Sequence, residues 1–367
     1  MTPLHQLAEQ GQSVWIDFLS RRFVHEGDLA GLIRDGVVGV TSNPTIFQGA
    51  IAEGDAYDEQ IKELTATESE PKEIFIALAR DDIRAACDLL RQVWDEGEGK
   101  DGWVSLEVDP NLAHETQRTI DEAARLHALV DRPNLLIKIP ATREGLPAIE
   151  ETIAAGIPVN VTLIFSLERH REVAEAYVRG LQRLVDGGGD ASRIASVASF
   201  FVSRVDTEAD RRLDEVGGHD ELKGTLAIAN AKLAYATYHE IFSGDAWEKL
   251  AAAGATPQRC LWASTSTKNP EYRDVIYVEE LVGPDTVNTM PRETVEAVLD
   301  HAKIERTLDR DVDGARRTLE AFAAAGIDYH EVVETLEREG VEKFAKSFRE
   351  LFADIEGKRD ELVGATA

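Results

Sequence analysis

Eight short runs of apolar and β-branched residues alternate along the chain with longer stretches whose apolar positions recur every three or four residues. The short runs have the length and composition of buried strands, whereas stretches such as 117–130, 167–185 and 220–242 have the spacing of amphipathic helices. Strands that alternate with helices form parallel sheets with right-handed crossovers. The predicted strands lie within residues 13–19, 37–44, 103–110, 134–142, 159–166, 195–203, 260–267 and 285–291.

The number of these units predicts the fold class. Eight strand–helix units in about 290 residues are typical of a (β/α)8 barrel, the TIM barrel. A doubly wound open sheet is the alternative, but no G-x-G-x-x-G motif follows an early strand. We therefore predict an α/β protein in which residues 1–367 form a single barrel domain, with its strands inside residues 13–291.

Two segments exceed the minimal barrel. Residues 45–102 separate the second and third predicted strands and are long enough for two or more helices. Residues 292–367 are helical in pattern, and one apolar stripe in them predicts that this C-terminal extension packs on the outer wall or rim of the barrel. The stripe consists of Val341, Phe344, Phe348, Leu351, Phe352 and Ile355.

Composition limits the class of protein and of partner. The chain has 43% hydrophobic residues and no run close to the ~18 apolar residues of a membrane span. Its first residues lack the basic and apolar stretches of a secretory signal. The two cysteines, Cys87 and Cys260, lie far apart and are expected to be reduced core residues. These features predict a cytoplasmic protein.

The charge balance is strongly acidic, with 68 Asp and Glu against 40 Lys and Arg, for a net charge of −28. This excess argues against nucleic acid or an anionic membrane surface as a partner. It would also repel a phosphorylated metabolite at long range. Any anion site must therefore be a local cluster of hydrogen-bond donors and positive charges.

Lys138 is the most informative single residue, because it lies inside the apolar run 135–140 (LLIKIP). A lysine is rarely buried without a partner, and burial disfavours the ammonium form. A neutral amine in a dry site is a nucleophile that forms Schiff bases with carbonyl substrates. The alternatives are a lysine that snorkels from a strand end and a buried Lys–Glu pair, and the segment alone leaves them open.

Polar residues embedded in the predicted strands should meet at the carboxyl end of the barrel, where TIM barrels have their active sites. Asp17 and Glu107 are the carboxylates closest to the interior. They could supply the proton transfers of Schiff-base chemistry, or they could only neutralise Lys138 as a salt bridge. Asn160 and Thr162 share strand parity, so both should face the same side.

Further polar residues follow other predicted strands. Asn43, before Pro44, could hold a substrate hydroxyl or form an ordinary Asx turn. A phosphate site is expected after the later strands, although a solvated loop with surface charges is the alternative. Its candidate residues are Arg204, Ser264, Ser266 and Lys268. The nine histidines are scattered without metal-ligand spacing, so we expect no metal and no cofactor.

Two long motifs resemble the signatures of the transaldolases. Residues 40–47 (VTSNPTIF) are similar to the first, and residues 135–146 (LLIKIPATREGL) to the second, which contains the Schiff-base lysine. Residues 160–166 (NVTLIFS) and 199–204 (SFFVSR) extend the resemblance through the barrel. The similarity covers about residues 4–291 and extends into the tail.

The resemblance implies a transaldolase of the pentose phosphate pathway. Such an enzyme transfers a dihydroxyacetone unit from sedoheptulose 7-phosphate to glyceraldehyde 3-phosphate, giving erythrose 4-phosphate and fructose 6-phosphate. By this resemblance Lys138 forms the imine and Asp17 is the acid/base at the cleaved bond. Glu107 and Thr162 hold the water of imine formation. The resemblance assigns the dihydroxyacetone part to Asn43, Asn160 and Ser199, and the phosphate to Arg204 and Ser264.

The sequence departs from the family at the phosphate site. Many transaldolases have an arginine shortly after the residue that matches Ser264, whereas this chain has Ser266 and Lys268. A lysine can replace the charge but cannot offer a forked pair of donors. Phe201 and the chain length favour transfer over the short fructose-6-phosphate aldolases, which resemble this chain but have a tyrosine near that position.

Three functions remain to be separated. The first is transaldolase activity, the second is a Schiff-base aldolase that releases free dihydroxyacetone, and the third is a barrel that only binds sugar phosphates. In each, the expected partners are small sugar phosphates. Monomer and homodimer both remain open.

Overall fold

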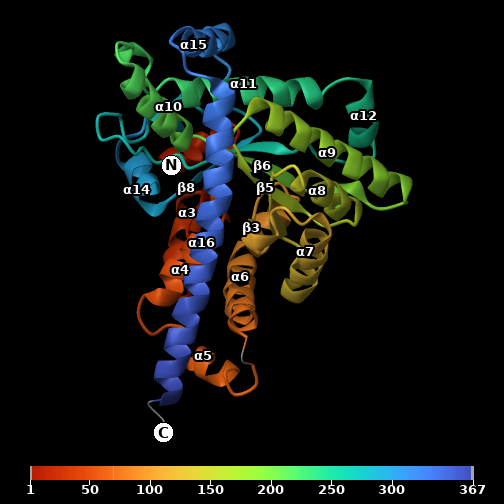
Figure 1. The fold of residues 1–367 in the computed structure, drawn as a ribbon. Helices are drawn as coiled ribbons and strands as arrows, with labels where there is room; N and C mark the ends of the chain where they lie inside the picture. The colour runs from red at the N-terminus through yellow and green to blue at the C-terminus, as the bar shows by residue number, and fades with distance from the viewer. Residues whose placement is uncertain (1, 69, 365–367) are drawn as a thin grey trace.

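The computed structural model describes residues 2–68 and 70–364, in which eight parallel strands form a closed barrel surrounded by helices (Figure 1). Each strand pairs with the next along the chain, and the last strand closes the barrel against the first. This arrangement confirms the predicted (β/α)8 barrel. The strands are β1 (Gln12–Ile16), β2 (Val37–Val40), β3 (Trp103–Glu107), β4 (Leu135–Pro140), β5 (Val159–Ile164), β6 (Ser196–Phe201), β7 (Arg259–Ala263) and β8 (Thr286–Met290).

The strands end earlier than the apolar patterns predicted, because polar residues at their carboxyl ends turn the chain into loops. Asp17 follows β1, and Asn43 is the N-cap of the helix that follows β2. Its Oδ1 accepts a hydrogen bond from the backbone N of Ile46 at 3.0 Å. Since a capping side chain satisfies an otherwise free N–H, Asn43 fixes where the strand-to-helix turn occurs.

The crossover helices surround the barrel (Figure 1). The predicted helix at 117–130 is confirmed, and so is that at 167–185. The prediction of one helix over 220–242 is wrong at its start, because Gly224 has a left-handed φ of 71° and separates a short turn from the main helix. The elements from β3 to β8 are η1 (Pro110–Leu112), α7 (Thr116–Val130), α8 (Gly145–Ala154), α9 (Leu167–Asp186), η2 (Ala191–Arg193), α10 (Ser203–Val216), η3 (Asp220–Leu222), α11 (Leu226–Ile241), α12 (Asp245–Ala252) and α13 (Ile276–Glu279).

Helices also occupy the two segments that exceed a minimal barrel, as predicted. The segment between β2 and β3 contains α4 (Pro44–Ala52), α5 (Asp58–Leu64) and α6 (Pro71–Glu96), whereas α1 (Pro3–Glu9), α2 (Arg21–His25) and α3 (Asp28–Asp35) lie before β2. After β8 lie α14 (Arg292–His301), α15 (Val312–Ala324) and α16 (Tyr329–Gly364). Residues 365–367 of the predicted extension lie outside the described residues.

Helix α16 crosses the rim at the carboxyl end of the barrel, which confirms one of its two predicted positions. It is the long blue helix that runs from α15 to α5 in Figure 1, and it contacts α4, α6, α10 and β5. Its stripe is buried at Phe344, Phe348, Leu351 and Ile355. Phe348 meets Phe75 of α6 edge to face, with ring centroids 5.4 Å apart.

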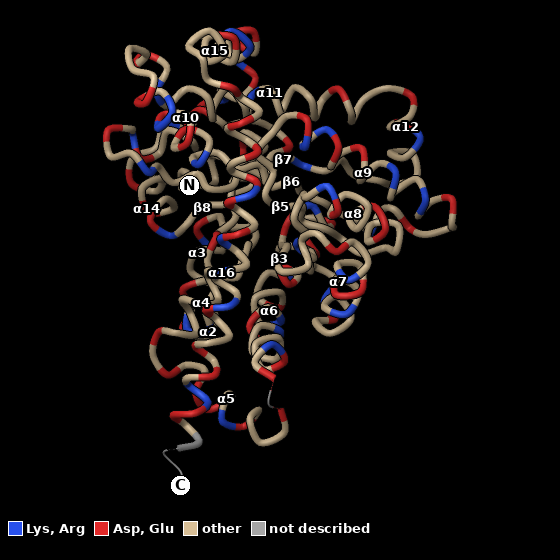
Figure 2. The backbone as a smooth tube through the Cα atoms, in the orientation of Figure 1, with Lys and Arg blue, Asp and Glu red and all other residues tan. Residues whose placement is uncertain are grey.

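The apolar interior of the barrel is closely filled. Gly39 of β2 faces Trp15 of β1, and a Cβ atom at Gly39 would lie 2.5 Å from the indole ring, so only glycine fits there. Cys87 and Cys260 are buried and free, as predicted. No described helix is both long and apolar enough to cross a membrane. Acidic and basic residues are interspersed along the outer helices (Figure 2).

Candidate active site

Lys138 of β4 lies inside the barrel with 4% of its surface exposed. Its Nζ is 3.0 Å from Oε2 of Glu107 and donates a hydrogen bond to the backbone O of Ser42 at 3.1 Å. The ring centroid of Phe344, from α16, is 5.6 Å from the same Nζ. The amine therefore does not snorkel to solvent; it lies in a buried site with a carboxyl group beside it.

Glu107 lies opposite Lys138 because β3 and β4 are in register at these two residues. Burial raises the pKa of the Glu107 carboxyl, and the positive charge of Lys138 only partly opposes this effect. A carboxyl group with a raised pKa can hold a proton and return it. Glu107 is thus positioned to exchange a proton with the Lys138 amine.

Asp17 follows β1, and its backbone N donates a hydrogen bond to Met290 O of the neighbouring strand β8 at 2.8 Å. Oδ1 of Asp17 accepts a hydrogen bond from Oγ1 of Thr41 at 2.7 Å, and Thr41 in turn contacts Thr289 Oγ1 at 2.7 Å. Burial raises the pKa of the Asp17 carboxyl, against the lowering effect of Lys138. The site therefore contains two carboxyl groups whose pKa values are raised by the same cause.

A β-bulge shapes β5 at Thr162. The pairing of β5 with β6 shifts register between Val161 and Ile164, and Leu163 has a left-handed φ of 59°. Oγ1 of Thr162 is buried and has no hydrogen-bond partner among the described residues. An unpartnered buried hydroxyl that lines a cavity is suited to bind substrate or water.

Ser199, Asn160 and Ser105 form a hydrogen-bonded chain next to Lys138. Ser199 Oγ donates to Asn160 Oδ1 at 2.7 Å, and Asn160 Nδ2 donates to Ser105 Oγ at 3.0 Å. This chain fixes the orientation of the Asn160 amide. Ser199 therefore presents to the cavity a hydroxyl whose direction is already determined.

A cavity of about 220 Å³ opens at the carboxyl end of the barrel. Most predicted site residues line it together, although they come from six different strand–loop units. Glu107 and Asn160 do not line it; they lie behind Lys138 and Ser199. The predicted residues that line it are Asp17, Asn43, Lys138, Thr162, Ser199, Arg204, Ser264, Ser266 and Lys268.

One side of the cavity carries positive charge. Arg204, in the first turn of α10, lies over the Phe201 ring at 5.0 Å, and burial lowers the pKa of its guanidinium. Lys268 donates to Ser266 Oγ at 2.7 Å. Ser264 has a left-handed φ of 56° and its Oγ is 2.9 Å from Ser203 Oγ. This combination of hydroxyls and cations is suited to a phosphate group.

Several lining residues were not singled out from the sequence. Lys343 and Phe344 come from α16, more than fifty residues after β8. Phe344 was placed on the apolar stripe, but the stripe shows only that the helix packs. Nothing in the local sequence indicates which end of the barrel it covers, so only the tertiary structure brings Lys343 to the site.

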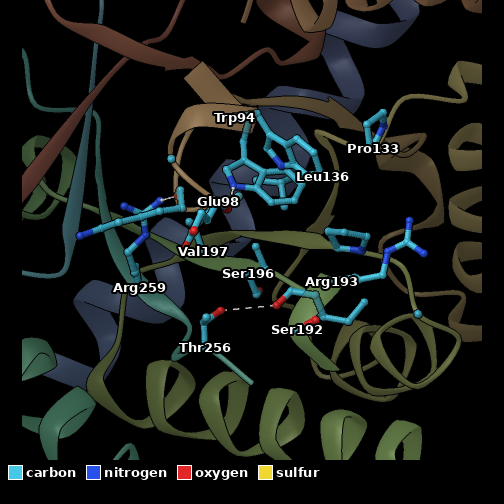
Figure 3. A pocket seen from close by; sticks show the side chains of 18 of the residues that line it. Trp94, Glu98, Pro133, Leu136, Ser192, Arg193, Ser196, Val197, Thr256 and Arg259 are labelled. Atoms are coloured by element: carbon cyan, nitrogen blue, oxygen red, sulfur yellow. Dashed lines mark hydrogen bonds between the residues drawn. The ribbon is translucent and has the colours of Figure 1, made fainter. Parts of the chain in front are cut away.

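A second, larger cavity of about 1100 Å³ lies at the opposite, amino end of the barrel. Figure 3 shows Trp94, Arg193 and Arg259, from distant parts of the chain, around it. Most of its charged side chains are exposed, and Arg259 is already paired with Asp101 at 3.0 Å. In TIM barrels this end serves stability, whereas chemistry occurs at the carboxyl end.

Comparison with known proteins agrees with this geometry. The sequence matches the family described as Transaldolase/Fructose-6-phosphate aldolase over residues 14–355. A transaldolase of Acidothermus cellulolyticus is 54% identical over 356 residues, which cover 96% of each chain. Transaldolases of Mycolicibacterium smegmatis and Thermobifida fusca are 53% and 54% identical, over 97% and 95% of this chain and 97% and 96% of theirs. The chain therefore belongs to the transaldolase/fructose-6-phosphate aldolase family.

Proposed function

We propose that this protein is a transaldolase that acts through a Schiff base on Lys138. It transfers a dihydroxyacetone unit from sedoheptulose 7-phosphate to glyceraldehyde 3-phosphate, giving erythrose 4-phosphate and fructose 6-phosphate. The observation that carries the proposal is the buried Lys138 amine, 3.0 Å from Glu107, at the base of a cavity that is also lined by the half-buried Asp17 and several cations.

Imine formation is the first step. Glu107 accepts a proton from Lys138, and the neutral amine attacks the ketone carbon of the donor. The resulting carbinolamine loses its hydroxyl as water, and Glu107 returns the proton that this departure requires. Thr162, whose Oγ1 has no partner in the described structure, holds that water.

Asp17 carries out the next proton transfer. It removes the proton from the hydroxyl next to the breaking carbon–carbon bond, and the first aldehyde leaves. The electron pair of the broken bond passes into the imine, which becomes an enamine attached to Lys138. The enamine carbon then attacks the carbonyl carbon of the acceptor aldehyde. Asp17 returns its proton to the new alkoxide, and hydrolysis of the imine releases the product.

Transfer requires that the enamine outlive the first aldehyde, because protonation by water would release dihydroxyacetone instead. Phe201 and Phe344 line the cavity near Lys138 and exclude water from it. Asn43 and Ser199 orient the dihydroxyacetone hydroxyls, with Asn160 positioning Ser199. The phosphate of either aldehyde lies against Arg204, Ser264, Ser266 and Lys268.

An aldolase that releases free dihydroxyacetone is the second candidate, because the family includes fructose-6-phosphate aldolases. Phe201 favours transfer, since a phenyl ring at the cavity wall has no hydroxyl to hold a water near the enamine. A barrel that only binds sugar phosphates would not need two carboxyl groups with raised pKa values beside a lysine. The reduced, buried cysteines fit a reaction in the cytoplasm.

Borohydride reduction in the presence of fructose 6-phosphate tests the mechanism. It should label one peptide, the one that contains Lys138. A coupled assay for free dihydroxyacetone, with and without acceptor aldehyde, tests transfer: release without acceptor should be slow. Label on another residue would reject the assigned nucleophile, and acceptor-independent release at a comparable rate would identify an aldolase.

A further inference from the structure

Three cations line the cavity at the carboxyl end of the barrel. Arg204 of α10, Lys268 after β7 and Lys343 of α16 line the same cavity of about 220 Å³. These three positive charges gather at one opening in a chain whose net charge is −28. Arg204 is half-buried, whereas Lys268 and Lys343 are exposed at the mouth of the cavity, so together they form a local positive field that favours an anion.

Helix α16 holds Lys343 at the cavity through Gly340 and Phe344, which lie on the face of the helix that packs on the barrel. One turn earlier, Gly340 lies against Leu163 of β5, where a Cβ atom would be 3.0 Å from the leucine Cδ2. Directly after Lys343, Phe344 is buried, with its ring 5.6 Å from Lys138 Nζ. The backbone on both sides of Lys343 is therefore fixed by packing on the barrel.

Lys343 has no protein partner for its charge. Among the described residues, neither Lys343 nor Arg204 makes an ion pair or a hydrogen bond through its charged group. By contrast, Lys346 on the same helix lies 3.6 Å from Glu350. Lys343 is exposed at the mouth of the cavity, where partial desolvation lowers its pKa and the charges of Arg204 and Lys268 lower it further. An anion bound between these three residues would relieve the repulsion between them.

The acidic residues at the cavity do not fill this role. Asp17 is bonded to Thr41 and belongs to the catalytic part of the site. Glu293 of α14 also lines the cavity, but it makes no ion pair with Arg204, Lys268 or Lys343 among the described residues. The opening next to Lys343 is left for an anion from solution.

We propose that Lys343 binds the phosphate group of the sugar substrates, together with Arg204 and Lys268. The C-terminal extension is then part of the active site and supplies a cation in addition to Arg204 and Lys268. This inference rests on the proposed function for the identity of the substrate. A lysine contributes a point charge, so it attracts the phosphate without fixing its rotation.

Two matched variants test this role. Lys343→Met should raise KM for glyceraldehyde 3-phosphate roughly 10-fold, the effect of one lost hydrogen bond to a charged group, with kcat little changed. KM for unphosphorylated glyceraldehyde should stay the same. Lys346→Met, on the same helix but outside the cavity, should change neither value, and Lys343→Arg should restore most of the affinity. Equal KM changes for both aldehydes would overturn the proposal, because they would indicate a structural effect.

Binding of inorganic phosphate, measured by calorimetric titration, separates this inference from the proposed function. Affinity should fall about 10-fold in Lys343→Met and remain unchanged in Lys346→Met. Unchanged phosphate affinity in Lys343→Met would overturn the assigned role. If affinity falls only in Lys343→Met while the wild-type protein transfers nothing between sugar phosphates, the anion site stands and the proposed function fails.

Discussion

The two ends of the barrel each contain a buried or half-buried arginine next to a cavity, but they differ in how its charge is satisfied. At the amino end, Arg259 donates to Ser13 Oγ at 2.9 Å, Lys100 O at 2.6 Å and Asp101 Oδ1 at 3.0 Å. At the carboxyl end, Arg204 has no ion pair with any described residue and faces a cavity. The charge of Arg259 is therefore neutralised within the protein, whereas the described residues leave the charge of Arg204 unpaired toward the cavity.

Cavity volume alone would have pointed to the wrong end. The cavity at the amino end holds about 1100 Å³ and that at the carboxyl end about 220 Å³. Among the described residues, the smaller one contains a buried lysine beside a carboxyl group, a buried threonine hydroxyl without a partner and a half-buried arginine without an ion pair. The larger one also has an unpartnered buried atom among them, Trp94 Nε1, but most of the charged side chains that line it are exposed. Since burial of polar and ionisable groups destabilises a fold, their concentration around Lys138 indicates a function more clearly than empty space does.

The sharpest test of the comparison is at Lys138. In Lys138→Arg the positive charge beside Glu107 remains, so the protein should fold and unfold at a temperature close to that of wild type. A guanidinium does not deprotonate and cannot form the imine, so transfer activity should fall roughly 10⁴-fold or more. Steady-state assays and a thermal melt measure the two effects. Activity within 10-fold of wild type would remove Lys138 from the reaction.

Removing the charge of a carboxyl group should affect catalysis at the carboxyl end of the barrel, at Asp17, but not at the amino end, at Asp101. Asp17→Asn should lower kcat by about 10²–10⁴-fold, the usual contribution of an acid/base residue. Borohydride should still trap the imine on Lys138, because Glu107 serves that step. Asp101→Asn, at the amino end, should leave kcat within about twofold. Loss of trapping in Asp17→Asn would assign Asp17 to imine formation instead of carbon–carbon cleavage.

Arg259 tests whether the amino end serves stability. In Arg259→Met the Asp101 carboxylate loses its ion-pair partner in a mostly buried site, which should lower the free energy of unfolding by about 3 kcal/mol. Urea denaturation measures this change. KM and kcat should stay the same, and a selective loss of activity without loss of stability would give this end a function in the reaction.

Asp206 is a carboxyl group on α10 that is buried but does not line the cavity, so its ionisation should affect stability and not the reaction. It accepts hydrogen bonds from Ala227 N and Tyr277 Oη, both at 2.7 Å, and burial raises its pKa to about 7. The folded state therefore binds a proton that the unfolded state releases, and this contribution to stability is lost as pH rises from about 4, the ordinary pKa of an aspartate, to about 7.

The variant Asp206→Asn should remove that pH dependence. The amide can still accept from Ala227 N through its oxygen and donate to Tyr277 through its nitrogen. Between pH 5 and pH 8 the wild-type protein should lose about 2 kcal/mol more unfolding free energy than the variant does. Urea unfolding at several pH values measures the difference. Parallel curves for the two proteins would show that Asp206 ionises normally.

Much of the architecture could be predicted from the sequence, because it depends on local patterns. All eight strands follow from short apolar runs, and the closed barrel follows from their number and their alternation with helices. The error at 220–242 came from Gly224, whose left-handed backbone ends one turn and starts another inside a continuous helical pattern. Asn43 shows the same limit, since capping and substrate contact both fit its sequence.

The chemistry carried on the strands can be read from the sequence, because a lysine, carboxyl groups and hydroxyls at strand positions must meet where parallel strands end. The contribution of α16 and the partner of each charge depend instead on tertiary packing. Helical periodicity indicates that one face of α16 is buried, but it contains no information about which surface covers that face. Lys343 therefore reaches the cavity through packing between segments that are distant in sequence.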